Sequence, residues 1–256
     1  MKVLRPLLIA YSTVNKTEYQ IKISQTLIKE FPELSFGYEA LSLSFLNVGD
    51  EVNAVQILHK ALNKFPNEII FPQTLASIYY QSKNFKLAEK YYKIALIINP
   101  QILLIKHNLA KMFEEMGATG RADSLFKNII QQNKNNGLGL NDYAYIISER
   151  NHISINELKY ALELAEQAMS IDPKNAAYLD TIGWIHYKMG TYEEAHKYLE
   201  KSITIDQNNP VILEHMGDIY HQLGISAKAL IHYKKALEQD SNNIIIQDKI
   251  DKLHGK

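Results

Sequence analysis

The chain has 256 residues, of which 28 are Lys or Arg and 28 are Asp or Glu, and it contains no cysteine. A formal net charge of zero argues against a general nucleic-acid or anionic-membrane binder, because both classes depend on an excess of basic residues. The lack of cysteine excludes a disulfide framework, a thiolate nucleophile and any zinc site with cysteine ligands.

Proline and glycine recur at a fixed distance along the chain. Pro32, Pro66 and Pro100 are each 34 residues apart, and Gly183 and Gly217 have the same spacing. A constant period of this size predicts stacked supersecondary units that share one continuous core. The predicted units are 1–34, 35–68, 69–102, 103–136, 137–175, 176–209 and 210–243, followed by a tail at 244–256.

Each unit has the pattern of two antiparallel helices. Apolar residues at unit positions 4, 7 and 11 predict an amphipathic first helix. Small residues at positions 8 and 20 allow two helices to approach to about 8–10 Å, and a large residue at position 24 fills the space beside them. Position 8 holds Ser42, Ala76, Ala110, Ala144, Gly183 and Gly217; position 20 holds Ala54, Ala88, Ala122, Ala161, Ala195 and Ala229; position 24 includes Leu58, Tyr92, Phe126, Leu199 and Tyr233.

Turn and capping residues mark the helix ends. Gly49, Gly117, Gly190 and Gly224 lie near position 15, where a turn needs a positive φ. Thr191-x-x-Glu194 predicts a capping box at the start of a second helix. Proline at position 32 predicts the end of that helix, because proline lacks the amide donor.

This set of residues resembles the tetratricopeptide repeat, and the resemblance covers 243 of the 256 residues. The resemblance implies an all-α fold, a right-handed superhelix of helix pairs whose first helices line a concave groove. Unit one departs from the pattern, with Pro6 inside its first helix and with Leu8 and Gln20 at positions that hold small residues elsewhere. Unit five is five residues longer, and we expect the extra residues in the turn around 149–153, either as tolerated variation or as a lip on the groove.

The two ends of the chain differ. Ile246, Ile250 and Leu253 form one apolar face, which predicts a capping helix in the tail. Residue 1 is already in phase with the repeat and no polar cap precedes it, so we expect the native protein to extend further upstream. This expectation leaves the compartment open between the cytoplasm, if Met1 is the native start, and the bacterial cell envelope, if the chain is a fragment.

If the resemblance holds, polar and aromatic residues of units five to seven line the groove. Trp184, the only tryptophan, lies off the apolar stripe and is the best candidate for a binding anchor. The alternative is that Trp184 packs between neighbouring first helices as part of the scaffold. The predicted partner-binding residues are Asn141, Asp142, Tyr145, Asp180, Thr181, Trp184, Tyr187, Glu214, His215, Asp218 and His221.

Charge on the same positions indicates the kind of partner. Asp142, Glu149, Asp180, Glu214 and Asp218 oppose Lys188 alone, which predicts a basic or neutral polar segment. Family members that bind chaperone tails use a clamp of lysine and asparagine side chains at set positions. No three consecutive units here supply that clamp.

No motif indicates catalysis, a cofactor or a metal. His215, Asp218 and His221 form an H-x2-D-x2-H string, but histidines six residues apart on a helix point about 120° away from each other. One small ion would not easily reach both. Phosphate-binding and nucleophile-elbow motifs are absent from the sequence.

The sequence therefore predicts a non-enzymatic scaffold that holds a protein or peptide in its groove. Two alternatives remain open: an RNA-binding helical-repeat protein, in which aromatic residues stack on bases, and a self-assembling module that associates through unit one. Residues 140–201 also resemble the distal repeats of bacterial adaptor proteins. That resemblance implies that Asn141, Asp180 and Trp184 are partly a structural signature. No run approaches the about 18 apolar residues of a membrane span, and the few apolar residues after Pro6 do not indicate a signal peptide.

Overall fold

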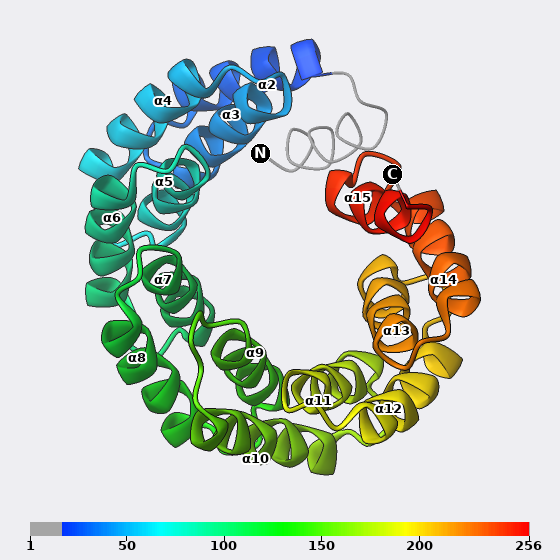
Figure 1. Cartoon of the computed structure of the whole chain (residues 1–256). Coiled ribbons are helices and arrows are strands. Elements are labelled where there is room, and N and C mark those ends of the chain that lie inside the picture. The colour runs from blue at the N-terminus through cyan, green and yellow to red at the C-terminus, as the bar shows by residue number, and fades with distance from the viewer. Residues whose placement is uncertain (1–16, 256) are drawn as a thin grey trace. The chain divides into compact units, whose positions relative to one another are not determined.

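A computed structural model describes residues 17–255, which form fourteen α-helices and no strand (Figure 1). The predictions on Pro6 and Leu8, and most of the first helix of unit one, lie outside the described residues. The helices are α2 (Thr17–Glu30), α3 (Ser35–Asn47), α4 (Glu51–Lys64), α5 (Ile70–Gln81), α6 (Phe85–Ile98), α7 (Leu103–Glu115), α8 (Thr119–Gln132), α9 (Gly137–Ser148), α10 (Ile155–Ile171), α11 (Ala176–Lys188), α12 (Tyr192–Ile205), α13 (Pro210–Gln222), α14 (Ser226–Gln239) and α15 (Ile244–Leu253).

The helices belong to two compact units, and the division falls inside α8, between Leu125 and Phe126. These two halves of the chain are written with numerals, unit 1 and unit 2, whereas the repeats keep the names unit one to unit seven. In each unit the helices alternate between two layers (Figure 1). In unit 2, α9, α11, α13 and α15 form one layer, here called the first-helix layer, and α10, α12 and α14 form the other. In unit 1, α3, α5 and α7 take the place of first helices and α4 and α6 that of second helices. The chain is thus all-helical and repetitive, as predicted.

Close packing inside each pair depends on the small residues at positions 8 and 20. All six alanines at position 20 are fully buried. A Cβ added to Gly183 would lie 2.0 Å from Leu199 Cδ1 and 3.1 Å from the Ala195 carbonyl oxygen. The residue at position 24 therefore fills the space that the glycine leaves open, which confirms the packing predicted from the sequence.

The turns confirm the predicted positive φ angles at position 15. Gly49, Gly117, Gly190 and Gly224 have φ between 71° and 77°, and Lys83 takes a similar conformation at 57°. Glycine has no Cβ to oppose this conformation, whereas a lysine adopts it at a steric cost. The prolines also behave as predicted: α4, α6 and α10 each end two residues before a proline.

The two predicted capping boxes have different outcomes. Glu157 N donates to Ser154 Oγ at 3.3 Å and Ser154 N donates to the Glu157 carboxylate at 2.9 Å, so the box that opens α10 is present. The box predicted at Thr191 is wrong. The Thr191 hydroxyl donates to the His186 carbonyl at 3.1 Å and makes no cap bond to α12.

The extra residues of unit five are shared between a turn and a helix. Residues 149–154 join α9 to α10, whereas residues 189–191 join α11 to α12. In addition, α10 has 17 residues and α12 has 14. The capping box starts α10 one turn earlier relative to its packing alanine, Ala161. The expectation that the turn alone takes up the insertion is therefore wrong.

The tail forms the predicted helix, α15. Ile246 and Ile250 are buried and Leu253 packs against the same core cluster, which includes Leu213 and Tyr233. Asp251 occupies the place that a small residue holds in the other first helices, and it accepts a hydrogen bond from Gln247 Nε2 at 3.1 Å.

Candidate functional site

The predicted partner-binding residues lie on three helices of the first-helix layer of unit 2. Asn141, Asp142 and Tyr145 are on α9; Asp180, Thr181, Trp184 and Tyr187 are on α11; Glu214, His215, Asp218 and His221 are on α13.

Several polar bonds between successive first helices share one spacing. Four of them join residues 35 apart at matching places of the repeat, that is, one repeat period plus one residue. The partners occupy position n of one unit and position n+1 of the next. These pairs are Tyr80 with Glu115, Asp180 with His215, Tyr187 with Gln222, and Glu214 with Lys249. Trp184 and Glu149 are also 35 residues apart, but the longer unit five puts them at positions 9 and 13.

Trp184 lies inside a stack of aromatic rings. Its ring centroid is 4.0 Å from that of His215 and 4.8 Å from that of Tyr187, with interplanar angles of 13° and 9°. The indole Nε1 donates to Glu149 Oε1 at 2.7 Å, and Lys188 Nζ lies 3.0 Å from the same oxygen. With 8% of its surface exposed, Trp184 packs between first helices in this conformation. Its role as a binding anchor remains a prediction.

A buried acid and histidine pair joins α11 to α13. His215 Nδ1 lies 2.9 Å from Asp180 Oδ1, and the side chains are 7% and 8% exposed. Because an ionised carboxylate only accepts, His215 Nδ1 carries the proton of this bond. The pair fixes the orientation of the imidazole ring against Trp184.

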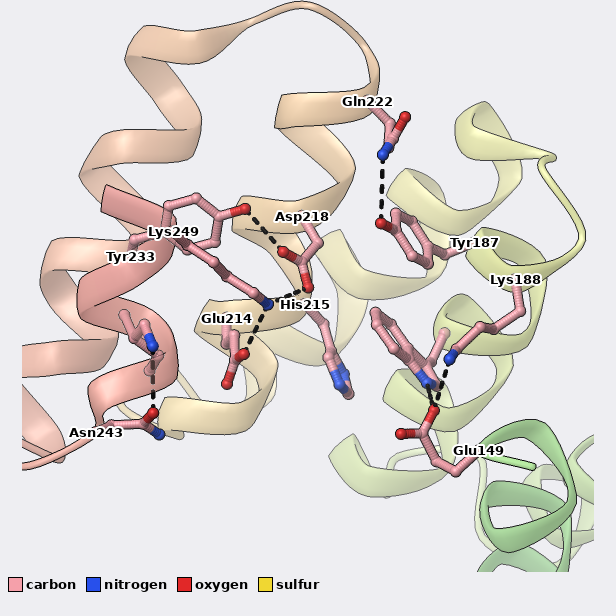
Figure 2. A network of polar contacts seen from close by, with 12 residues as sticks. Glu149, Tyr187, Lys188, Glu214, His215, Asp218, Gln222, Tyr233, Asn243 and Lys249 are labelled. Atoms are coloured by element: carbon pink, nitrogen blue, oxygen red, sulfur yellow. Dashed lines mark hydrogen bonds and ion pairs between the residues drawn. The ribbon is translucent and has the colours of Figure 1, made fainter. Parts of the chain in front are cut away.

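Lys249 joins α15 to the same layer (Figure 2). Its ammonium lies 2.7 Å from Glu214 Oε1 and 2.7 Å from Asp218 Oδ2, and Tyr233 OH donates to Asp218 Oδ1 at 2.7 Å. Burial lowers the pKa of Lys249, but Asp218 and Glu214 outweigh that effect and the net shift is upward. Burial and the Asp218 carboxylate together raise the pKa of Tyr233.

Tyr145 lies half-buried among carboxylates from three helices. Burial raises the pKa of its hydroxyl to about 12, with further contributions from Glu149, Asp180 and Glu214. Its ring centroid is 6.5 Å from that of His215. Within residues 17–255 the Tyr145 hydroxyl has no hydrogen-bond partner.

The other predicted residues differ in their exposure. Thr181 is buried, Asp142 is half-buried and His221 is exposed. His215 and Asp218 bind different partners, and no group of three or more potential metal ligands occurs among the described residues. The three residues of the H-x2-D-x2-H string therefore do not converge.

Sequence reasoning missed Lys249 as a member of the network. With it, the first-helix layer of unit 2 has five predicted carboxylates against two lysines instead of one. Lys249 could have been found from its separation of 35 residues from Glu214, because this separation places Lys249 at position 6 of the repeat that follows unit seven. Counting the tail as a separate cap concealed that relation.

The sequence profile named "Tetratricopeptide repeat" matches residues 73–102, 176–209 and 212–243. The chain contains tetratricopeptide repeats. The matched segments lie in both compact units, and each contains one helix pair of the kind described above. No described helix is both long and apolar enough to cross a membrane.

Three curated relatives match parts of this tetratricopeptide repeat protein. The human Cell division cycle protein 16 homolog is 28% identical over 124 residues, which is 47% of this chain and 20% of that protein. The protein ycf37 of Pyropia yezoensis is 32% identical over 30% of this chain and 46% of its own length. The TPR repeat-containing protein PA4667 of Pseudomonas aeruginosa is 24% identical over 60% of this chain and 26% of its own. The matches therefore span less than half of each relative.

Solved structures share the fold at low sequence identity. A tetratricopeptide repeat protein from Parabacteroides merdae superposes with a TM-score of 0.78 at 16% identity, covering 100% of this chain and 98% of that one. Cut9 in the APC/C hetero-tetramer Cut9-Hcn1 gives a TM-score of 0.69 at 17% identity, covering 96% of this chain and 48% of that one. At these identities the likeness concerns the fold alone.

Proposed function

We propose that this tetratricopeptide repeat protein holds a peptide or protein segment against the first-helix layer of unit 2 and catalyses no reaction itself. The observation that carries the proposal is the continuous polar and aromatic network on α9, α11, α13 and α15. Buried hydrogen bonds such as that between His215 and Asp180 hold the side chains of the network in place. A face that is already ordered loses less side-chain entropy when it binds.

Exposed groups of the same layer supply the contacts in this proposal. Tyr145 and Tyr187 are half-buried, and Glu149, His221 and Gln222 are exposed. Tyrosines give large contact area together with a polar tip, which suits recognition of a peptide. One solved structure that shares the fold is that of the APC/C hetero-tetramer Cut9-Hcn1, an assembly of several chains, which supports the proposal.

The predicted chemistry of the partner is basic or neutral polar. The five predicted carboxylates outnumber Lys188 and Lys249, and α15 adds Asp248, Asp251 and Lys252, so the face keeps an excess of negative charge after its internal ion pairs are formed. Electrostatic complementarity of this kind favours partners with lysine or arginine and disfavours phosphate groups.

Photo-crosslinking tests which face is used. A photoreactive amino acid replaces His221 or Gln222 on the first-helix layer, with Glu166 and Lys201 on exposed parts of α10 and α12 as matched controls. We expect irradiation in a lysate of the source organism to give protein adducts from the first pair and none from the second. These exposed sites are used because replacing the buried Trp184 would disturb folding.

Adducts that form only from the control positions would overturn the proposal. Adducts to RNA in place of protein would favour the RNA-binding alternative, and adducts between copies of this chain would favour self-association. Mass spectrometry of the adducts distinguishes these outcomes.

A further inference from the structure

One buried acceptor in the first-helix layer of unit 2 has no donor. Among the described residues, Asn141 Oδ1 is one of two buried side-chain atoms without a hydrogen-bond partner, and Asn141 is 6% exposed. A buried polar atom left unpaired costs about 1–3 kcal/mol. If this face binds a partner as proposed, a donor of the partner can pair with such an atom.

Tyr145 lies one turn further along the same face of α9. Its hydroxyl also has no partner within the described part of the chain, although the ring is only half-buried. Burial raises the pKa of this hydroxyl, and the charges of Glu149, Asp180 and Glu214 add to the shift. The Tyr145 ring lies 6.5 Å from the ring of His215, the partner of Asp180.

Each of these carboxylates has an oxygen to spare. Asp180 binds His215 through Oδ1, Glu149 binds Trp184 and Lys188 through Oε1, and Glu214 binds Lys249 through Oε1. The second oxygen of each group accepts no hydrogen bond from any residue in 17–255. Asn141 and Tyr145 share one face of α9, and the Tyr145 ring lies near the His215 ring, which binds Asp180.

We propose that Asn141, Tyr145, Asp180 and Glu214 form a binding site for a cationic side chain, the ammonium of a lysine or the guanidinium of an arginine. This inference rests on the proposed function, since it names the group by which the bound segment is held. A cation with several N–H donors satisfies acceptors on more than one helix, and the aromatic rings add a cation–π contribution. A neutral side chain would leave the carboxylates uncompensated.

The site can be tested without knowing the natural partner. Trp184 is the only tryptophan and stacks on His215, so its fluorescence reports on this part of the layer. The probes are N-acetyl-arginine amide and N-acetyl-lysine amide, with N-acetyl-citrulline amide as the neutral isostere of the first. We expect a saturable response to the two cations and none to citrulline, measured by fluorescence and in parallel by titration calorimetry.

Variants assign the binding to this site. Asn141→Leu removes the buried acceptor and is expected to weaken binding about tenfold, the size expected for one charge-assisted contact. Asn141→Asp adds a charge and is expected to tighten binding, which a merely structural role would not produce. Glu166→Gln on the exposed face of α10 is the matched control and should change nothing.

The two proposals fail in different ways. No binding of either cation by the wild-type protein, or equal weakening by Glu166→Gln, would overturn the cation site, while crosslinks from His221 and Gln222 could still support partner binding. Cation binding with the expected variant pattern but no crosslinked partner would leave the cation site standing and contradict the proposed function.

Discussion

The first-helix layers of the two compact units use the same spacing for different purposes. In unit 1, Tyr80 and Lys83 bind Glu115, and the Lys83 and Glu115 side chains are 66% and 39% exposed. In unit 2, Asp180 binds His215, and both side chains are less than a tenth exposed. The first contact lies near the ends of α5 and α7, and the second lies in the first half of α11 and α13. The same spacing of 35 residues therefore gives an exposed pair near the helix ends and a buried pair in the first half of the helices.

Positions 5 and 6 of the repeat show the difference most clearly. In unit 1 they hold Gln73 and Thr74 of α5, which are half-buried. In unit 2 they hold Asp180 and Thr181 of α11, which are buried. A buried polar network costs more to break than an exposed one, because the remaining partner cannot turn to water. Breaking a polar contact at these positions should therefore cost more in unit 2 than in unit 1.

The largest effect is expected from breaking the buried pair. Asp180→Leu leaves His215 Nδ1 without an acceptor and should lower the free energy of unfolding by about 3 kcal/mol. Glu115→Leu in unit 1 should cost no more than about 1 kcal/mol, because its ion pair is exposed. Urea denaturation of both variants measures the difference. Equal losses would show that burial does not distinguish the two layers.

A smaller effect is expected at alkaline pH from Tyr145. Its pKa is about 12 in the folded protein against a reference value of 10.0, so the unfolded state loses the proton first. Between these values the folded state binds more protons, and stability falls as pH rises through this window by about 2 kcal/mol. Tyr145→Phe should remove this part of the loss. Stability curves at several pH values compare the two proteins, and identical slopes would contradict the prediction.

The smallest effect concerns the glycines at position 8, where unit 1 has Ser42, Ala76 and Ala110. A Cβ at Gly217 would lie 2.4 Å from Tyr233 Cε1, and that ring is 2% exposed. Gly217→Ala should therefore destabilise by about 1 kcal/mol, although alanine is the better helix former. Gly120→Ala in α8 meets nothing within 4 Å and should stabilise slightly. Thermal melting gives the sign of each change, and a more stable Gly217→Ala would refute the packing argument.

Features that repeat with the period were predictable from the sequence. Ala195, Leu199 and the turn glycine Gly190 each occupy a position whose neighbours lie in the same unit, so one pattern fixes their surroundings. The predicted helix pairs and their packing residues are confirmed for this reason. The Thr191 cap was not predictable from its motif, because the nearby His186 carbonyl competes for the same hydroxyl.

Contacts between neighbouring repeats were harder to predict. Trp184 lies off the apolar stripe of its own helix, and its burial comes from His215 on the next first helix. Lys249 meets Glu214 for the same reason. Such contacts depend on the rotation from one helix pair to the next, which no single repeat encodes. For the partner-binding residues, the sequence predicted their common layer, and their binding role remains a prediction.

The bonds with a spacing of 35 residues have a consequence for how such a chain can be recombined. Each bond is divided between two repeats, so a repeat carries one half of the bond to its predecessor and one half of the bond to its successor. Exchanging or duplicating a repeat would bring together halves that do not match, for example Asp180 with a copy of Thr181 in place of His215. The repeats have similar backbones, but their order along the chain cannot be changed without breaking these bonds. A consensus repeat designed from this chain would need an acid at position 5 and a donor at position 6 in the same unit.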